Sequence, residues 1–117
     1  MEKLVALLKG NETTFEDVPG AHGDVAIFSR NLTGLSSTIG AGFKHLKKAT
    51  IDWQLRYDEV VYVVSGNMFI MEDGNKIEAK EGDLYFLKKG ACVTYGTDTE
   101  VKFFYSLYPI NWREGKE

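Results

Sequence analysis

The stretch from Trp53 to Gly66 decides the fold, and it reads WQLRYDEVVYVVSG. Its second half, from Val60 to Val64, is a run of β-branched and aromatic residues that favours a strand. Similar runs recur at intervals of roughly ten residues from Val25 onward, with glycine, aspartate and asparagine between them. The sequence therefore predicts an all-β sandwich or barrel.

The expected strands cover residues 25–29, 37–44, 50–55, 59–64, 67–71, 76–79, 83–87, 92–95 and 101–107. Asp73-Gly74 is typical of a tight hairpin, because both residues tolerate positive φ angles. We expect further chain reversals at four glycines, which are Gly66, Gly82, Gly90 and Gly96. Both prolines, Pro19 and Pro109, lie outside the expected central strands, as a sheet requires.

Length and charge restrict the class of protein. A chain of 117 residues with 44% hydrophobic residues predicts a single domain. The net charge of -3 and the scattered basic residues exclude a phosphate-binding surface, so no nucleic-acid partner is expected.

The short run Lys44, Lys47 and Lys48 around His45 is interpreted as a solvated face, with a weak anion site as the alternative. Cys92 is the sole cysteine, which excludes an internal disulfide and a thiolate zinc cluster.

The ends of the chain are expected to lie outside the barrel. Residues 1–24 are interpreted as an N-terminal arm, 25–110 as the barrel and 111–117 as a loose tail. Residues 3–9 fit a helical turn, an edge strand that crosses to a partner, or an irregular arm. The apolar run from Leu4 to Leu8 is too short for a signal peptide or a membrane span. We therefore expect a cytoplasmic protein with no membrane partner, and a homodimer that covers this run.

The spacing within this stretch resembles the first motif of the cupins, H-x-H, three or four residues, then E-x6-G. Glu59 and Gly66 have the spacing of the last two positions, while the histidine positions fall on Trp53 and Leu55. The resemblance implies a cupin barrel, also called a double-stranded β-helix or jelly roll. Neither tryptophan nor leucine can bind a metal.

The second cupin motif, G-x5-P-x-G-x2-H, points the same way. Gly82, Lys88, Gly90 and Val93 occupy its positions, so its glycines are present and its histidine is not. Glu59 is then the only metal ligand left of four. We expect no bound metal and no other cofactor.

A longer resemblance covers the stretch from Ala41 to Trp112, which is similar to the cupin domain of the ethanolamine-utilisation EutQ family. The residues that carry it are Ala41-Gly42-Phe43, Trp53, Tyr57-Asp58-Glu59, Gly66, Lys80-Glu81-Gly82-Asp83, Lys89-Gly90, Gly96-Thr97, Val101-Lys102-Phe103, Pro109 and Asn111-Trp112. The family also lacks the metal histidines, but it more usually has proline where this chain has Lys88. Longer members carry an additional N-terminal region.

The resemblance implies association with bacterial microcompartments and their proteins, and an acetate kinase activity has been attributed to the family. ATP would be a cofactor only if that activity is retained. The chain has no Gly-Lys-Ser or Gly-Lys-Thr of a Walker loop, so a kinase would need a different nucleotide site.

Strand alternation predicts the lining of the barrel, since the motif glutamate of a cupin points inward. The catalytic candidates are Glu59, Tyr57 and Asp58, and the substrate-binding candidates are Trp53, Tyr95, Leu55 and Val93. Among aromatic rings Glu59 would be desolvated and could act as a general acid or base. The alternatives are that Glu59 ties two strands together by hydrogen bonds from Tyr57 or the backbone, that Asp58 caps a turn, and that the aromatic residues only fill the core.

Two functions fit these residues. The first is a barrel that binds a small polar metabolite, with a transfer or isomerisation step through Glu59 and Tyr57. The second is a non-catalytic cupin dimer that acts as an accessory protein. The sequence does not decide whether a reaction is catalysed, because both functions use the same fold.

Overall fold

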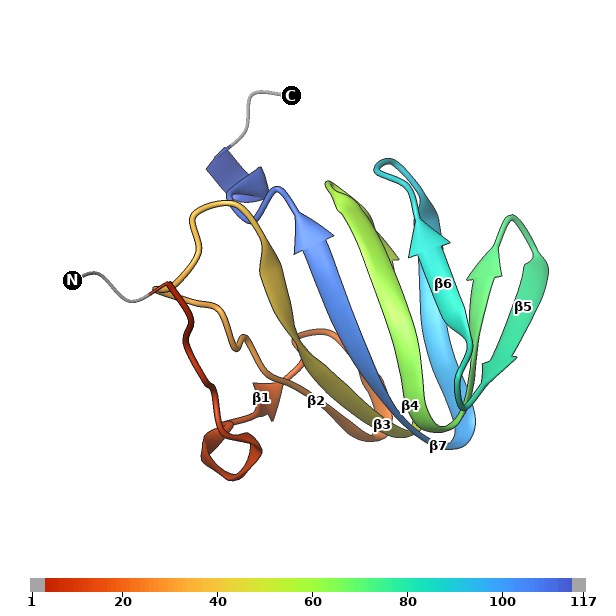
Figure 1. The fold of residues 1–117 in the computed structure, drawn as a ribbon. Helices are drawn as coiled ribbons and strands as arrows, with labels where there is room; N and C mark the ends of the chain where they lie inside the picture. The colour runs from red at the N-terminus through yellow and green to blue at the C-terminus, as the bar shows by residue number, and fades with distance from the viewer. Residues whose placement is uncertain (1–3, 115–117) are drawn as a thin grey trace.

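Strands make up nearly all the regular structure of this protein (Figure 1), for which the computed structural model describes residues 4–114. The strands are β1 (Glu16–Asp17), β2 (His22–Phe28), β3 (Gly40–Gln54), β4 (Asp58–Glu72), β5 (Asn75–Lys80), β6 (Leu84–Leu87) and β7 (Cys92–Tyr108). Two short 3-10 helices, η1 (Gly10–Glu12) and η2 (Trp112–Glu114), lie near the ends of the chain. The predicted all-β class is confirmed.

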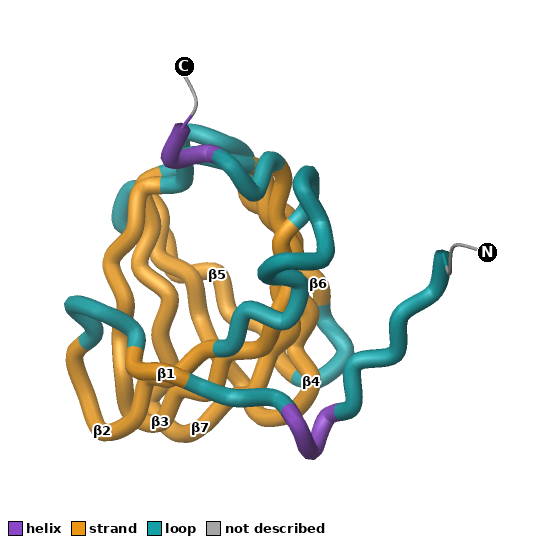
Figure 2. The backbone as a smooth tube through the Cα atoms, turned by 90° about the vertical axis from the view of Figure 1, so that its left-hand side faces the viewer, coloured by secondary structure: helices purple, strands orange, loops and turns teal. Residues whose placement is uncertain are grey.

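All strand pairs are antiparallel, and the sheet has the order β1-β2-β3-β7-β4-β5, with β6 paired to β4. The long strands β3, β4 and β7 bend around a common interior, so that the sheet curls into a barrel (Figure 2). Glu59 lies opposite Leu87 of β6 and Leu107 of β7. It therefore has a neighbouring strand on each side.

The long strands merge pairs of strands that the sequence analysis separated. The reversals expected at Gly66 and Gly96 are wrong, because both glycines lie inside strands, β4 and β7. Gly66 has φ 84 and sits at a shift of register between β4 and β7, where a Cβ would lie 2.1 Å from the carbonyl oxygen of Glu100. Here glycine allows a bulge instead of a turn. The Asp73-Gly74 turn is confirmed, with φ angles of 51 and 78.

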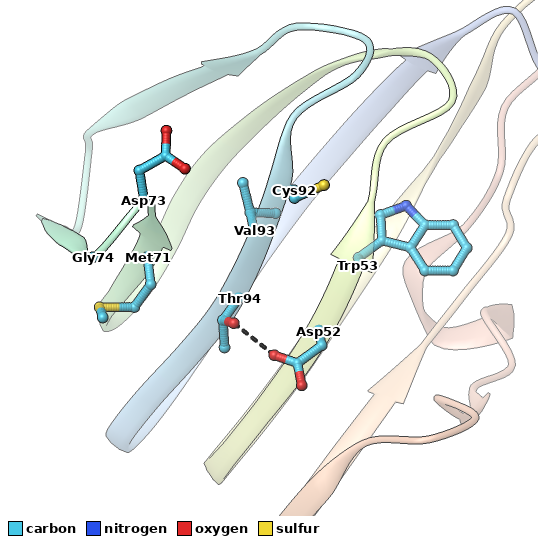
Figure 3. A pocket seen from close by; sticks show the side chains of 8 residues that line it. All are labelled: Asp52, Trp53, Met71, Asp73, Gly74, Cys92, Val93 and Thr94. Atoms are coloured by element: carbon cyan, nitrogen blue, oxygen red, sulfur yellow. Dashed lines mark hydrogen bonds between the residues drawn. The ribbon is translucent and has the colours of Figure 1, made fainter.

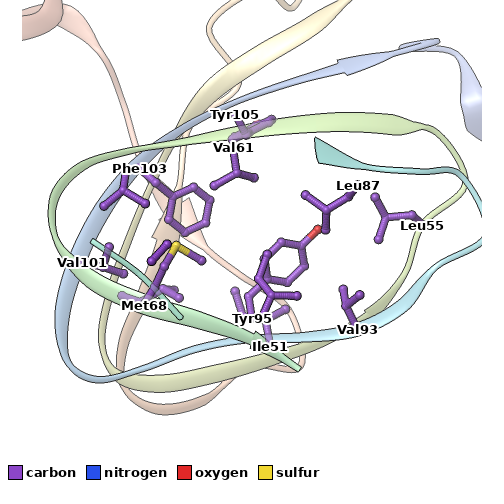
Figure 4. Packing of buried hydrophobic residues seen from close by; sticks show 14 of the residues in the cluster. Ile51, Leu55, Val61, Met68, Leu87, Val93, Tyr95, Val101, Phe103 and Tyr105 are labelled. Carbon is purple, nitrogen blue, oxygen red and sulfur yellow. The ribbon is translucent and has the colours of Figure 1, made fainter. Parts of the chain in front are cut away.

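The core lies inside the barrel and is built from alternate residues of the long strands (Figure 4). Fully buried apolar and aromatic members from β3, β4 and β7 are Leu46, Val61, Val63, Tyr95, Val101 and Phe103. In Figure 4 the Tyr95 hydroxyl points from β7 into the same space. The interior is thus apolar apart from a few polar groups, which form the candidate site.

Residues 4–9 run away from the barrel (Figure 2), whereas β1 and the start of β2, which lie in the expected N-terminal arm of residues 1–24, belong to the sheet. Residues 4–9 have no regular secondary structure, while residue 3 lies outside the described range. Leu4, Val5 and Leu7 are each at least 80% exposed. None of the helices within residues 4–114 has the length and apolar character needed to cross a bilayer.

The C-terminal segment is described as far as residue 114, and residues 115–117 of the expected loose tail lie outside that range. Trp112 of η2 packs against two rings at the barrel mouth. Its ring centroid lies 5.8 Å from that of Trp53 and 5.4 Å from that of Tyr57. This contact closes one side of the candidate site.

Candidate functional site

Glu59 is a buried carboxyl group in the middle of the sheet. Its side chain is 2% exposed, and its Oε1 accepts a hydrogen bond of 2.5 Å from the Tyr95 hydroxyl. Burial raises the pKa of Glu59, while the Lys44 ammonium and the Tyr95 hydrogen bond act in the opposite direction. Tyr57 and the backbone were the expected hydrogen-bond partners of Glu59, and Tyr95 of β7 is the partner in the structure.

Lys44 brings a positive charge into the same interior. Its Nζ lies 5.1 Å from the ring centroid of Tyr95 and 5.1 Å from that of Tyr105. Phe103 is a third ring neighbour, at 5.9 Å. Burial lowers the pKa of Lys44, and the negative charge of Glu59 partly offsets this effect. The expectation that Lys44 belongs to a solvated basic face is therefore wrong.

Tyr57 is a second buried phenol, 6% exposed, at the start of the site. Its hydroxyl oxygen accepts a hydrogen bond of 2.9 Å from Nε1 of Trp53. Burial and the nearby Glu59 charge raise the pKa of Tyr57, so its hydroxyl stays protonated in the physiological range. Trp53 itself is 37% exposed and lies at the rim, where it holds Tyr57.

Tyr105 was not among the sequence candidates, yet it also faces the interior. Its hydroxyl donates a hydrogen bond of 2.6 Å to the Ser29 carbonyl, and burial with the Glu59 charge raises its pKa to about 12. Trp112 is another residue that sequence reasoning assigned to no site. Its place in the closing Asn111-Trp112 motif was the signal that could have found it.

Asp58 lies outside this group. It is exposed, and its Oδ1 accepts a hydrogen bond of 2.9 Å from the backbone N–H of Lys89. This contact matches the turn-capping alternative for Asp58. The structure thus separates Asp58 from its neighbour Glu59, since successive side chains of a strand point to opposite faces.

Leu55 and Val93 line the apolar part of the interior, with 1% and 7% of their surface exposed. A more open hollow of about 470 Å³ lies where β3 and β4 end and β7 begins (Figure 3). Its lining residues are Asp52, Trp53, Met71, Asp73, Gly74, Cys92, Val93 and Thr94. The hollow shares Trp53 and Val93 with the predicted substrate-binding set, but it does not reach Glu59 or Lys44.

A metal site of the usual cupin kind does not fit these residues. Trp53, Leu55 and Val93 stand at three of the four ligand positions, and the Glu59 carboxyl is held by Tyr95. Among residues 4–114 no group of three or more histidine, cysteine, aspartate or glutamate side chains could hold a metal ion. The ionisable groups that surround Glu59 are phenols and the Lys44 amine.

The curled antiparallel sheet and the motif glutamate define the class of protein, which is a cupin barrel. An RmlC-like cupin from Shewanella frigidimarina has the same fold, with a TM-score of 0.76 and 20% sequence identity over 98% of this chain and 100% of that one. The family model described as ethanolamine utilisation protein EutQ matches residues 4–114. The chain therefore belongs to the EutQ family.

Individual relatives agree with this assignment. The chain is 32% identical over 110 residues to "Acetate kinase EutQ" of Escherichia coli, with 93% of this chain and 47% of the relative covered. It is 35% identical over 88 residues to "Acetate kinase EutQ" of Clostridioides difficile, with 74% and 56% covered. The chain thus spans about half the length of these curated relatives.

The match to one solved structure covers most of both chains. The crystal structure of ethanolamine utilization protein Q from Salmonella typhimurium superposes with a TM-score of 0.80 at 31% identity, over 90% of this chain and 86% of that one. The relation to the family therefore holds in both sequence and fold.

Proposed function

We propose that this EutQ-family barrel binds a small polar metabolite in its interior and exchanges a proton with it through Glu59. The observation that carries the proposal is the Glu59–Tyr95 pair, a buried carboxyl group bonded to a phenol at 2.5 Å. A carboxyl whose pKa is raised toward the working pH can both donate and accept a proton. Tyr95 would relay that proton and hold the carboxyl in place.

Tyr57 supports the proposal as a second polar contact for the metabolite. Within the described part of the chain, its hydroxyl has one hydrogen bond, which it accepts from Trp53. Its own proton is therefore available for a ligand oxygen or nitrogen. A purely structural role for these groups is less favourable, because an apolar pair would fill the same space without desolvating a carboxyl.

The names of the relatives suggest the first ligands to test. Two of them are called acetate kinase, so acetate and acetyl phosphate are the candidate metabolites, with ATP as the phosphoryl donor if a kinase step is retained. Ethanolamine is the third candidate because of the family description. Acetate kinase activity stays part of the proposal, since the chain spans only about half of those relatives.

Calorimetric titration tests the proposal with acetate, acetyl phosphate, ethanolamine and ATP as separate probes. We expect at least one probe to bind the wild type and to lose its binding heat in Glu59→Gln. The matched control is Asp58→Asn, which changes the neighbouring exposed carboxylate and should leave binding unchanged. Equal binding by wild type and Glu59→Gln would contradict the role of Glu59.

The proposal includes a homodimer in the cytoplasm that associates with microcompartment proteins. Two exposed apolar surfaces support the dimer. One is the arm from Leu4 to Leu8, and the other is a row on the outer face of the sheet. In this row Tyr62 pairs with Leu84 of β6, both are more than 40% exposed, and Phe43 packs 5.5 Å from Phe104. A second copy would remove both surfaces from water. Membership of the ethanolamine-utilisation family supports the location.

A further inference from the structure

Lys44 is a lysine in unusual surroundings, because its amino group points into the barrel among three aromatic rings. Within residues 4–114 no ion pair within 4.0 Å joins its Nζ to Glu59 or to another acid, and no hydrogen bond engages it. Every fully buried side-chain nitrogen or oxygen in that range has a hydrogen-bond partner, so this Nζ retains some contact with solvent. Lys44 is partly buried, and its Nζ lies against ring faces instead of an acid.

We propose that Lys44 is a nucleophilic amine that forms an imine with a small aldehyde or ketone inside the barrel. This inference rests on the proposed function, because it names the chemical class of the metabolite for the same interior. The geometry that carries it is the position of the amine, which faces the ring whose hydroxyl bonds to Glu59. The amine and the proton-exchanging pair therefore share one residue, Tyr95.

The surroundings favour the neutral form of the amine. Only the neutral form is a nucleophile, and apolar burial is one of the ways in which proteins produce it at neutral pH. Burial lowers the pKa of Lys44 in this way, and the charge of Glu59 opposes it. Protonation of Glu59, whose own pKa is raised, would remove that opposing charge.

The reaction needs no oxidant and no further reactant. The Nζ lone pair forms a bond to the carbonyl carbon, and the carbonyl π pair moves onto oxygen, which takes a proton from the Glu59–Tyr95 pair. The positively charged nitrogen returns one of its two protons to the pair, which leaves a neutral carbinolamine. The pair then protonates the hydroxyl group, which leaves as water while the nitrogen lone pair forms the C=N bond, and the iminium nitrogen returns its remaining proton to the pair. One amine and one carbonyl compound thus give one imine and one water.

A surface role for Lys44 does not explain these contacts. The neighbouring Lys47 is exposed on the same strand, and its side chain can be solvated without cost. Lys44 instead occupies the inward face between buried Gly42 and Leu46. Lys47 is therefore the internal comparison for any reaction of Lys44.

The experiment is reductive trapping with propanal and sodium cyanoborohydride at pH 7, followed by peptide mapping of the full chain. An exposed lysine is almost entirely ammonium at this pH, with roughly one in a thousand or fewer molecules neutral. We expect the propyl adduct to form on Lys44 at least about tenfold faster than on Lys47. Lys44→Arg has no primary amine, cannot form an imine, and should lose the fast adduct.

Modification of Lys44 no faster than Lys47 would overturn the inference. The peptide map of the wild type decides this even if Lys44→Arg fails to fold. The result is separable from the proposed function, because calorimetry with Glu59→Gln needs no covalent adduct. Loss of probe binding in Glu59→Gln without fast labelling of Lys44 would leave a metabolite-binding barrel and remove only the imine.

Discussion

Glu59→Gln and Leu55→Ala should affect this protein in opposite ways. Both side chains are buried, with 2% and 1% of their surface exposed. Glutamine has nearly the volume of glutamate but cannot ionise, so the substitution should abolish binding and keep the fold. Alanine leaves a cavity in the core, so Leu55→Ala should destabilise the fold.

The expected magnitudes follow from the contacts. In Glu59→Gln the amide oxygen can still accept the Tyr95 hydrogen bond, which changes from a charge-assisted bond to a neutral one. That change costs about 1 kcal/mol, and the lower desolvation of a neutral amide offsets part of it. Leu55→Ala removes about three methyl or methylene groups at about 0.8 kcal/mol each and adds a cavity, for a total of about 2–5 kcal/mol.

Urea denaturation followed by circular dichroism measures both values, and calorimetry measures binding on the same samples. We expect the free energy of unfolding to fall by at most about 1 kcal/mol in Glu59→Gln and by at least about 2 kcal/mol in Leu55→Ala. If Glu59→Gln destabilises the protein as much as Leu55→Ala does, the glutamate is a structural tie between strands. The proposed function would then be refuted.

Three further predictions concern pH, assembly and metal. Burial raises the pKa of Glu59 above its ordinary 4.5, so above pH 4.5 the folded chain retains a proton that the unfolded chain has lost. The stability of the wild type relative to Glu59→Gln should therefore fall as the pH rises above 4.5. Urea titrations in which that difference in stability is constant with pH would contradict this sign. Light scattering should give twice the mass of one chain, and removal of residues 1–10 should lower it, whereas a monomer at micromolar concentration would exclude the dimer. Elemental analysis after a chelator wash should find no stoichiometric transition metal, and about one iron, manganese, nickel or zinc per chain would show that a site was missed.

The fold could be predicted from the sequence because its signals are local. Strand runs, the Asp73-Gly74 turn and the spacing from Glu59 to Gly66 depend on residues close together in the chain. The lengths of the strands could not be predicted in the same way. Gly66 and Gly96 look like turn residues in the sequence. In the folded sheet their lack of a side chain instead allows close contacts, of Gly66 with Glu100 and of Gly96 with the ring of Phe69.

Part of the candidate site could also be predicted from the sequence. Leu55, Tyr57 and Glu59 are all buried, as the alternation predicted, although Leu55 and Tyr57 lie in the connection between β3 and β4. The hydrogen-bond partner of Glu59 was harder to predict, because Tyr95 lies far away in the sequence, on β7, and meets Glu59 only inside the folded barrel. The sequence predicts Tyr95 in the lining of the barrel but does not predict its hydrogen bond to Glu59.

Lys44 was missed for a definite physical reason. Counting back by twos from Leu55 passes through the buried Ile51 and Ala49, and it would next place Lys47 inward and Lys44 outward. A bulge in β3 inverts this order, since the register with β7 shifts between Lys47 and Ala49, and Lys48 has φ 44. Beyond the bulge the buried residue is Leu46, and Lys44 follows it on the inner face. One extra residue in a strand thus determines whether this amine faces the solvent or the ring of Tyr95, and the proposed imine depends on it.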